Sequence, residues 1–140
     1  MASSRKLSRK KANREALLKN GFKSLVLHKR IITTEARAKE IQRFAEKIIT
    51  KARRNDLAAK RFVDQKVSSK NVVKELFETV IPNLPKKESG FIKFQKVVHR
   101  GGDGADQAAL IIEKKKEEIK APAKKVKTVT KQKEDKPAKK

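Results

Sequence analysis

The N-terminal segment carries the residues whose types and spacing most directly indicate a chemistry. Six basic side chains lie between positions 5 and 14 with no acidic residue among them: Arg5, Lys6, Arg9, Lys10, Lys11 and Arg14. Guanidinium and ammonium groups bind phosphate oxygens through charge-assisted hydrogen bonds, so this segment can follow the backbone of a nucleic acid. The alternative is a solvated basic terminus that only aids solubility.

The overall charge favours the first interpretation. The chain has 140 residues, with 39 Lys and Arg against 16 Asp and Glu, which gives a net charge of +23. Like charges oppose compaction, so a protein that keeps such a charge commonly has a polyanionic partner. Nucleic acid is the first candidate, because each neutralised phosphate releases a counterion, and an anionic membrane surface is the second.

Further candidates for phosphate contact lie along the rest of the chain: Lys29, Arg30, Arg37, Lys39, Arg43, Lys47, Lys93 and Arg100. Positions 39, 43 and 47 recur at four-residue spacing and therefore share one edge of an expected helix. Glu40 and Glu46 can pair with some of these charges. The alternative for any single residue is an ordinary solvated helix face.

The sequence suggests no catalytic, metal or cofactor site. It has no cysteine, which excludes disulfides, thiolate zinc sites and cysteine nucleophiles. A metal-binding or general-base role for His28 or His99 would need convergent acidic partners, and each histidine instead precedes basic residues, as in a polar turn that faces RNA. The glycine-rich segment 100–104 lacks the Lys-Ser/Thr ending of a phosphate-binding loop and is expected to form a turn. We therefore expect no enzymatic activity and no small-molecule substrate.

Two further absences narrow the mode of binding. The chain has no Trp or Tyr and six Phe, so base stacking on aromatic rings is not expected to be the main mode of RNA recognition. No apolar run is long enough to cross a bilayer, and the N-terminus lacks the apolar core of a secretory signal. Phosphate contacts and recognition of RNA shape remain as the expected modes of binding, and no membrane partner is expected.

The chain divides into three parts. Residues 1–10 are basic with little periodicity and are expected to form an extended arm that orders on its partner. Residues 11–113 contain nearly all the apolar periodicity and form the folded domain. Residues 114–140 are a Lys-rich, low-complexity tail that is expected to be disordered when free.

The first half of the domain predicts two helices around a short strand. Leu18, Phe22 and Leu25 recur at helical spacing, and the β-branched stretch 31–33 predicts a strand. Thr34 is placed to cap the second helix. Its apolar stripe consists of Ala38, Ile41, Ala45, Ile48 and Ala52, and Asn55 is a plausible stop.

The second half predicts two more helices and a hairpin. A weaker helix is expected first, with Leu57, Ala58, Arg61, Phe62 and Gln65 on related faces. Ser69 is placed to cap another helix, which Pro82 ends. Strands are expected at Phe91–Val98 and Gln107–Ile112, joined by a turn. The order of helix, short strand, three helices and hairpin indicates an α+β domain with a small sheet.

Four segments resemble the large-subunit ribosomal protein seventeen family of bacteria. The most specific is Arg30-Ile31-Ile32-Thr33-Thr34-Glu35-Ala36-Arg37-Ala38-Lys39-Glu40, which is similar to the family's Ile-Ile-Thr-Thr entry and helix start. The stretches 44–50 (FAEKIIT), 74–77 (KELF) and 14–20 (REALLKN) are similar to other family elements, and together the matches cover residues 5–113.

The resemblance implies a fold of about four helices packed on a small mixed three-stranded sheet, with no catalytic activity. It also implies a structural role in the large ribosomal subunit of the bacterial cytoplasm, near the polypeptide exit tunnel, beside ribosomal RNA and neighbouring ribosomal proteins. The sequence departs from the family at Met1–Ser4 and at Ser89–Lys93, where the family has a Tyr and an Arg. These departures indicate a divergent bacterial lineage or an organellar relative.

Three other functions share parts of this pattern. A nucleoid-type DNA-binding protein would have the same charge, and comparing affinity for structured ribosomal RNA and duplex DNA separates the two. An RNA-processing enzyme would need a carboxylate cluster or an acid–base pair. A membrane-surface protein would need a helix with a broad, bulky apolar face and interfacial Trp.

Overall fold

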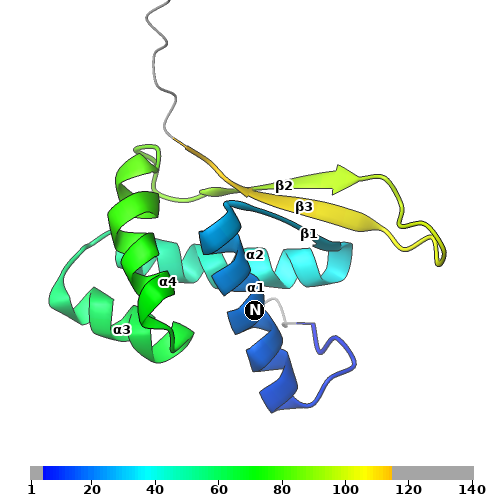
Figure 1. Cartoon of the computed structure of the whole chain (residues 1–140), viewed down its shortest axis with the longest axis horizontal. Coiled ribbons are helices and arrows are strands. Elements are labelled where there is room, and N and C mark those ends of the chain that lie inside the picture. The colour runs from blue at the N-terminus through cyan, green and yellow to red at the C-terminus, as the bar shows by residue number, and fades with distance from the viewer. Residues whose placement is uncertain (1–4, 115–140) are drawn as a thin grey trace, which may run out of the picture.

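The computed structural model describes residues 5–114, which fold into four helices and a three-stranded sheet (Figure 1). The elements in chain order are α1 (Lys11–His28), β1 (Arg30–Thr34), α2 (Glu35–Ala52), α3 (Leu57–Val67), α4 (Lys70–Glu75), β2 (Ile92–Val97) and β3 (Gln107–Ile112). A π-helical turn, Leu76–Val80, and a 3-10 turn, Ile81–Asn83, continue the course of α4. The expected α+β fold is confirmed.

The sheet has the order β1-β3-β2 and is antiparallel throughout. Ala109 at its centre pairs with Ile32 on one side and Gln95 on the other. The expected mixed sheet is therefore wrong. Because β3 lies between β1 and β2, the two strands that run in the same direction never become neighbours.

The core lies between one face of the sheet and the helices, and α2 runs along that face (Figure 1). The predicted stripe of α2, from Ala38 to Ala52, is buried at all five positions because helical spacing puts them on one side. Alternate residues of β3, Ala108, Leu110 and Ile112, face them from the sheet. Arg30 and Ile32 alternate with the core-facing Ile31 and so lie on the opposite sheet face.

Helix α1 crosses α2 at a close approach that requires glycine. A Cβ atom built on Gly21 would lie 2.5 Å from Cδ1 of Ile41, a buried α2 side chain. Phe22, next to this glycine, is fully buried and packs edge-on against Phe44, with ring centroids 6.1 Å apart. The crossing therefore fixes α1 firmly in its C-terminal half.

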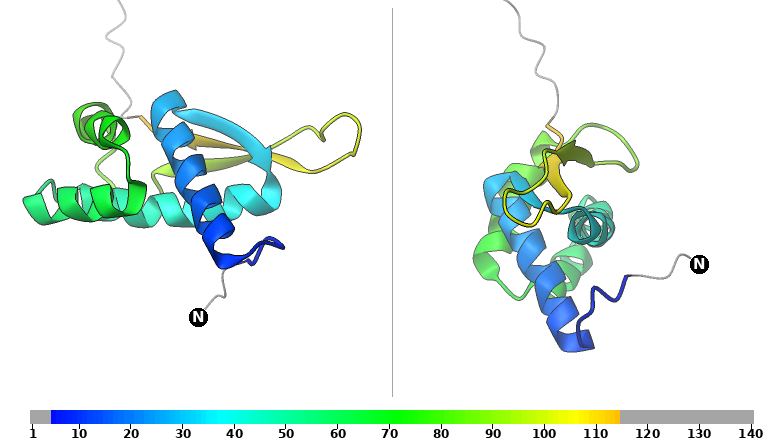
Figure 2. Two further views of the ribbon diagram at one scale, coloured as in Figure 1. Left: turned by 60° about the horizontal axis from the view of Figure 1, so that its bottom comes forward. Right: turned by 90° about the vertical axis from the view of Figure 1, so that its right-hand side faces the viewer.

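The N-terminal turns of α1 extend beyond the core. Residues 11–16 are exposed except for the partly buried Arg14, and Figure 2 shows this end of α1 projecting past the other helices. Residues 5–10 turn at Leu7 and Ser8, both with positive φ, and do not form the predicted extended arm. The tail beyond residue 114 lies outside the described residues.

Local signals set most element boundaries. Lys29 ends α1 in the left-handed conformation, and its N–H donates to the Leu25 carbonyl. Asp56 caps α3 by accepting from Ala59 N–H at 2.7 Å. Thr34 and Ser69 occupy the predicted cap positions, but neither side chain accepts a cap hydrogen bond. None of the helices in the described range has the length and apolar character needed to cross a membrane.

Candidate nucleic-acid interface

Five basic residues lie just before α1 and in its first turn, and we call them the arm cluster: Lys6, Arg9, Lys10, Lys11 and Arg14. None of them forms an ion pair with another residue in the range 5–114. The first turn of α1 has no acidic residue, and its cap residue Lys10 makes no side-chain cap hydrogen bond. Cations at the positive end of a helix dipole are unfavourable by themselves. An anion bound at this end of α1 would offset the repulsion between these cations and the helix dipole.

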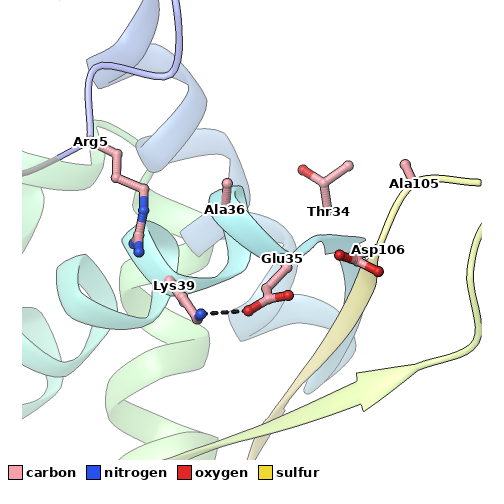
Figure 3. Close-up of a pocket in the computed structure, with 7 residues that line it drawn as sticks. All are labelled: Arg5, Thr34, Glu35, Ala36, Lys39, Ala105 and Asp106. Carbon is pink, nitrogen blue, oxygen red and sulfur yellow. Dashed lines mark hydrogen bonds and ion pairs between the residues drawn. The ribbon is translucent and has the colours of Figure 1, made fainter.

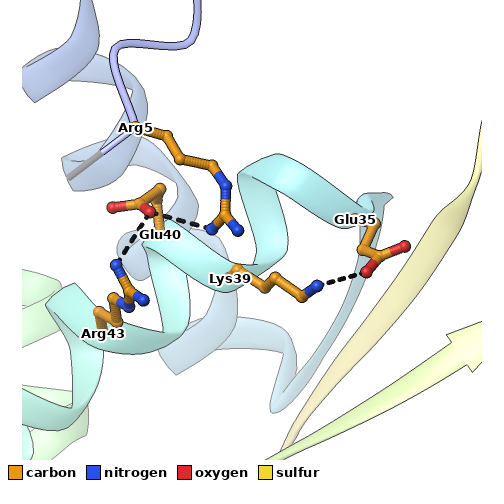
Figure 4. A network of polar contacts seen from close by, with 5 residues as sticks. All are labelled: Arg5, Glu35, Lys39, Glu40 and Arg43. Carbon is orange, nitrogen blue, oxygen red and sulfur yellow. Dashed lines mark hydrogen bonds and ion pairs between the residues drawn. The ribbon is translucent and has the colours of Figure 1, made fainter. Parts of the chain in front are cut away.

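Arg5 lies just before the arm cluster and is held differently. Its guanidinium Nη1 lies 3.2 Å from Oε1 of Glu40 on α2, and Arg43 Nη1 lies 3.4 Å from the same oxygen (Figure 4). Glu40 is 5% exposed and is the single buried charged residue in the described range. One carboxylate therefore ties the N-terminal segment to α2.

A hollow of about 340 Å³ lies beside this contact, between Arg5, the start of α2 and the chain entering β3 (Figure 3). Lys39 and Glu35 form an ion pair across one turn of α2 at its rim, and Lys96 lies 3.8 Å from the second Glu35 oxygen. The hydrogen bond from Lys39 lowers the pKa of the Glu35 carboxyl. Glu35 and Asp106 both line the hollow, so its charge is mixed.

Three other predicted contact residues are also paired with acids. Lys29 lies 2.7 Å from Glu75, and its hydrogen bond lowers the pKa of that carboxyl. Glu113 accepts from Lys87 at 2.9 Å and lies 3.2 Å from Lys93, and hydrogen bonds from these lysines lower its pKa. The third, Arg100, forms a two-bond pair with Asp103 inside the hairpin turn. These cations stabilise the fold locally before any partner binds.

The structure therefore sorts the fourteen predicted residues by their partners. Six are paired with acids: Arg5, Lys29, Lys39, Arg43, Lys93 and Arg100. Eight have no acidic partner within residues 5–114: the arm cluster, Arg30, Arg37 and Lys47.

The predicted residues also do not form one surface. Arg30 and Lys93 flank Ile111 in register on the outer sheet face, whereas the Arg5 contact places the N-terminal segment beside α2.

The expected role of Glu46 is wrong. Its Oε1 accepts from Ile92 N–H at 2.9 Å instead of pairing with a cation, and Gln42 donates to the Ile92 carbonyl at 3.0 Å. These two α2 side chains satisfy the outward backbone groups where β2 begins. Sequence reasoning also missed Phe62, whose ring lies 4.0 Å from Lys51 Nζ. Its helical spacing predicted only a contribution to a helix face.

The histidines and acids within residues 5–114 do not gather into a metal site. His99 Nδ1 lies 2.9 Å from Asp106, with both side chains exposed. Within the part of the chain that the structure describes, no three His, Asp or Glu side chains gather as metal ligands would.

The hairpin turn makes a prediction about pH. The pKa of Asp103 is lowered to about 2 by the hydrogen bond from Arg100 and by the backbone N–H of Ala105. A depressed pKa means that the contact contributes fully above the ordinary value of 3.8 and is lost as the pH falls through about 2. We expect the Asp103 carboxyl carbon to titrate near that lower value by NMR. In Arg100→Gln the titration should move back toward 3.8, whereas in Arg9→Gln it should not.

Comparison with known proteins identifies the family. The sequence profile described as Ribosomal protein L17 matches residues 17–113. The large ribosomal subunit protein bL17 of Clostridium perfringens (strain SM101 / Type A) is 44% identical over 110 residues, covering 79% of this chain and 97% of that protein. The bL17 of Pelobacter propionicus is 40% identical over 119 residues, covering 85% of this chain and 92% of that protein. The chain therefore belongs to the ribosomal protein L17 family.

Proposed function

We propose that this chain is a structural, non-enzymatic constituent of the large ribosomal subunit and binds its ribosomal RNA through phosphate contacts and shape. The arm cluster is the observation that carries the RNA-binding part. Its five cations lie at a helix N-terminus without an acidic partner among residues 5–114, while Arg5, Arg43 and Lys39 nearby are already paired. The assignment to the large subunit rests on the bacterial relatives, which are large ribosomal subunit proteins.

The two kinds of cation have different roles in this proposal. The arm cluster can bind phosphates without first breaking an ion pair within residues 5–114. Arg37 and Lys47 add two further cations of this kind on α2. Arg5 holds the N-terminal segment on Glu40 of α2, and Arg43 of the same helix contacts the same carboxylate, so the arm cluster is positioned before RNA arrives. Positioning in the free protein reduces the conformational entropy lost on binding.

The outer sheet face is a second contact region in the proposal. Arg30 and Lys93 lie on the two strands that flank β3, and Ile32, two residues after Arg30 on the same face of β1, is 51% exposed. This face combines two cations with apolar surface, so it suits the boundary between ribosomal RNA and a neighbouring ribosomal protein. The family resemblance implies that the site lies near the exit tunnel of a cytoplasmic bacterial ribosome.

Sedimentation with ribosomal subunits tests the function. The tagged chain should sediment with large subunits and stay out of small ones. In a filter-binding assay, its affinity for large-subunit ribosomal RNA should exceed that for duplex DNA and fall steeply with salt. Equal affinity for the two nucleic acids would favour the nucleoid-type alternative, and absence from large subunits would sink the proposal.

A further inference from the structure

The ring of Phe62 on α3 forms a shared wall between two surface hollows beside α2. The larger, of about 570 Å³, is lined by Gln42, Glu46, Lys47, Thr50, Lys51, Phe62, Ser89 and Gly90. The smaller, of about 240 Å³, is lined by Lys51, Arg54, Asp56, Ala58, Ala59 and Phe62. Phe62 is partly buried, so its ring is anchored in the fold while part of it faces solvent.

Cations frame this ring. Lys51 Nζ lies over it at 4.0 Å from the centroid, and Lys66 Nζ lies at 6.0 Å. Lys47 and Arg54 line the hollows and form no ion pair with the residues that the structure describes. An aromatic face surrounded by ammonium and guanidinium groups is complementary to a flat, uncharged ring that is attached to a negatively charged group, because the ring stacks and the cations bind the charge.

The two acidic residues that line the hollows, Glu46 and Asp56, both accept hydrogen bonds from backbone N–H groups. Glu46 accepts from Ile92 N–H at 2.9 Å, and Asp56 accepts from Ala59 N–H at 2.7 Å as the cap of α3. Neither carboxylate forms an ion pair with Lys47, Lys51 or Arg54. Three lining cations against two carboxylates leave the hollows with a net positive charge, and the cations are available to a ligand.

We propose that the two hollows bind one unpaired nucleotide of ribosomal RNA, with its base stacked on Phe62 and its phosphates held by Lys51 and Arg54. The inference rests on the proposed function and adds a base-stacking contact to it. RNA presents such nucleotides in loops and bulges, where bases stack on aromatic side chains. When the base stacks on Phe62, the ammonium group of Lys51 moves from the ring to the phosphate. Its positive charge is then balanced by the phosphate in place of the ring.

The chain has no Trp or Tyr, so a tryptophan introduced at one position is the single source of tryptophan fluorescence. Phe62→Trp places a single tryptophan in the whole chain, and stacking of a base on it should quench its fluorescence. Phe77→Trp is the matched control, because Phe77 is also partly buried beside a lysine, Lys60 at 5.7 Å, and does not line the hollows.

Large-subunit ribosomal RNA and polyphosphate are the two probes. We expect the RNA to quench the tryptophan of Phe62→Trp and to leave that of Phe77→Trp unchanged, and polyphosphate to quench neither. Phe62→Leu should lower the affinity for the RNA about tenfold without changing the salt slope, because the variant loses stacking and keeps every charge. In the unmodified chain, ultraviolet crosslinking and mass spectrometry should place a nucleotide on Phe62.

The outcomes separate this inference from the proposed function. RNA that binds Phe62→Trp without quenching it, and leaves no crosslink at Phe62 of the unmodified chain, would overturn the nucleotide site and leave ribosomal RNA binding intact. Equal quenching by polyphosphate would assign the hollows to phosphate alone and also overturn it. Failure of the RNA to bind the unmodified chain would remove both proposals.

Discussion

Replacing the five arm-cluster residues by glutamine is expected to weaken binding to large-subunit ribosomal RNA roughly a thousandfold at about 0.1 M salt. Each phosphate contact that is lost should make the log–log slope of affinity against salt shallower by about 0.7–0.9. Five lost contacts therefore flatten the slope by about 3.5–4.5. The fold should be unaffected, because these side chains lie outside the core and form no ion pair within residues 5–114.

The matched control removes the same charge elsewhere. Five exposed cations of α3, α4 and the loop after them also have no acidic partner in the described range: Lys60, Arg61, Lys70, Lys74 and Lys86. Replacing them by glutamine lowers the net charge from +23 by the same five units. We expect this control to lose far less affinity. Equal losses in the two variants would show that overall charge, and not the arm cluster, holds the RNA.

The helices and strands can be predicted because each has a local signal. Spacing alone predicts the stripe of α2 from Ala38 to Ala52, which is buried at every position. Strand β3 begins and ends at the predicted residues, Gln107 and Ile112. The start of α4 at Lys70 follows the predicted cap position Ser69. Such features depend on residues a few positions apart, which one sequence displays directly.

Features that depend on distant residues could not be predicted. The order β1-β3-β2 requires β1 to pair with a strand more than seventy residues later, which no local pattern encodes. Pro82 is a predicted helix end, but the α-helical course already gives way to a π-helical turn at Leu76. The polar, basic residues around Arg5 predict an extended arm. In the structure the chain turns at Leu7, and Arg5 just before this turn contacts Glu40 of α2.

The candidate site shows the same division. Charge and residue type identify the arm cluster and the basic edge of α2 without any structure. Which cations are already paired is not visible in the sequence, because Arg5 meets Glu40 across 35 positions and Lys29 meets Glu75 across 46. Glu46 is expected to pair with a cation, yet it accepts a hydrogen bond from the β2 backbone. The sequence thus shows that a cation is present, but only the tertiary structure shows whether it is available to RNA.

Truncating Phe22 to alanine is expected to have the largest effect on stability. Phe22 is fully buried between α1 and α2 beside Phe44, and removing such a ring costs about 3–5 kcal/mol. A domain of this size has roughly 5–15 kcal/mol in total, and the repulsion that accompanies a charge of +23 opposes its folding. Urea unfolding should show a lower midpoint with an unchanged slope. Leu27→Ala on the same helix is the control, because Leu27 is 50% exposed and its loss should cost under about 0.5 kcal/mol.

The same variant separates placement from charge in RNA binding. Phe22→Ala keeps every cation but loosens the helix that holds the arm cluster beside Glu40 and α2. At a temperature where the variant is largely unfolded, the salt slope should stay steep, since phosphate attraction requires only charge. The preference for large-subunit ribosomal RNA over duplex DNA should fall, since shape recognition requires the folded domain. If the unfolded variant kept that preference, the arm cluster would act as a simple polycation and the fold would have no part in selecting the RNA.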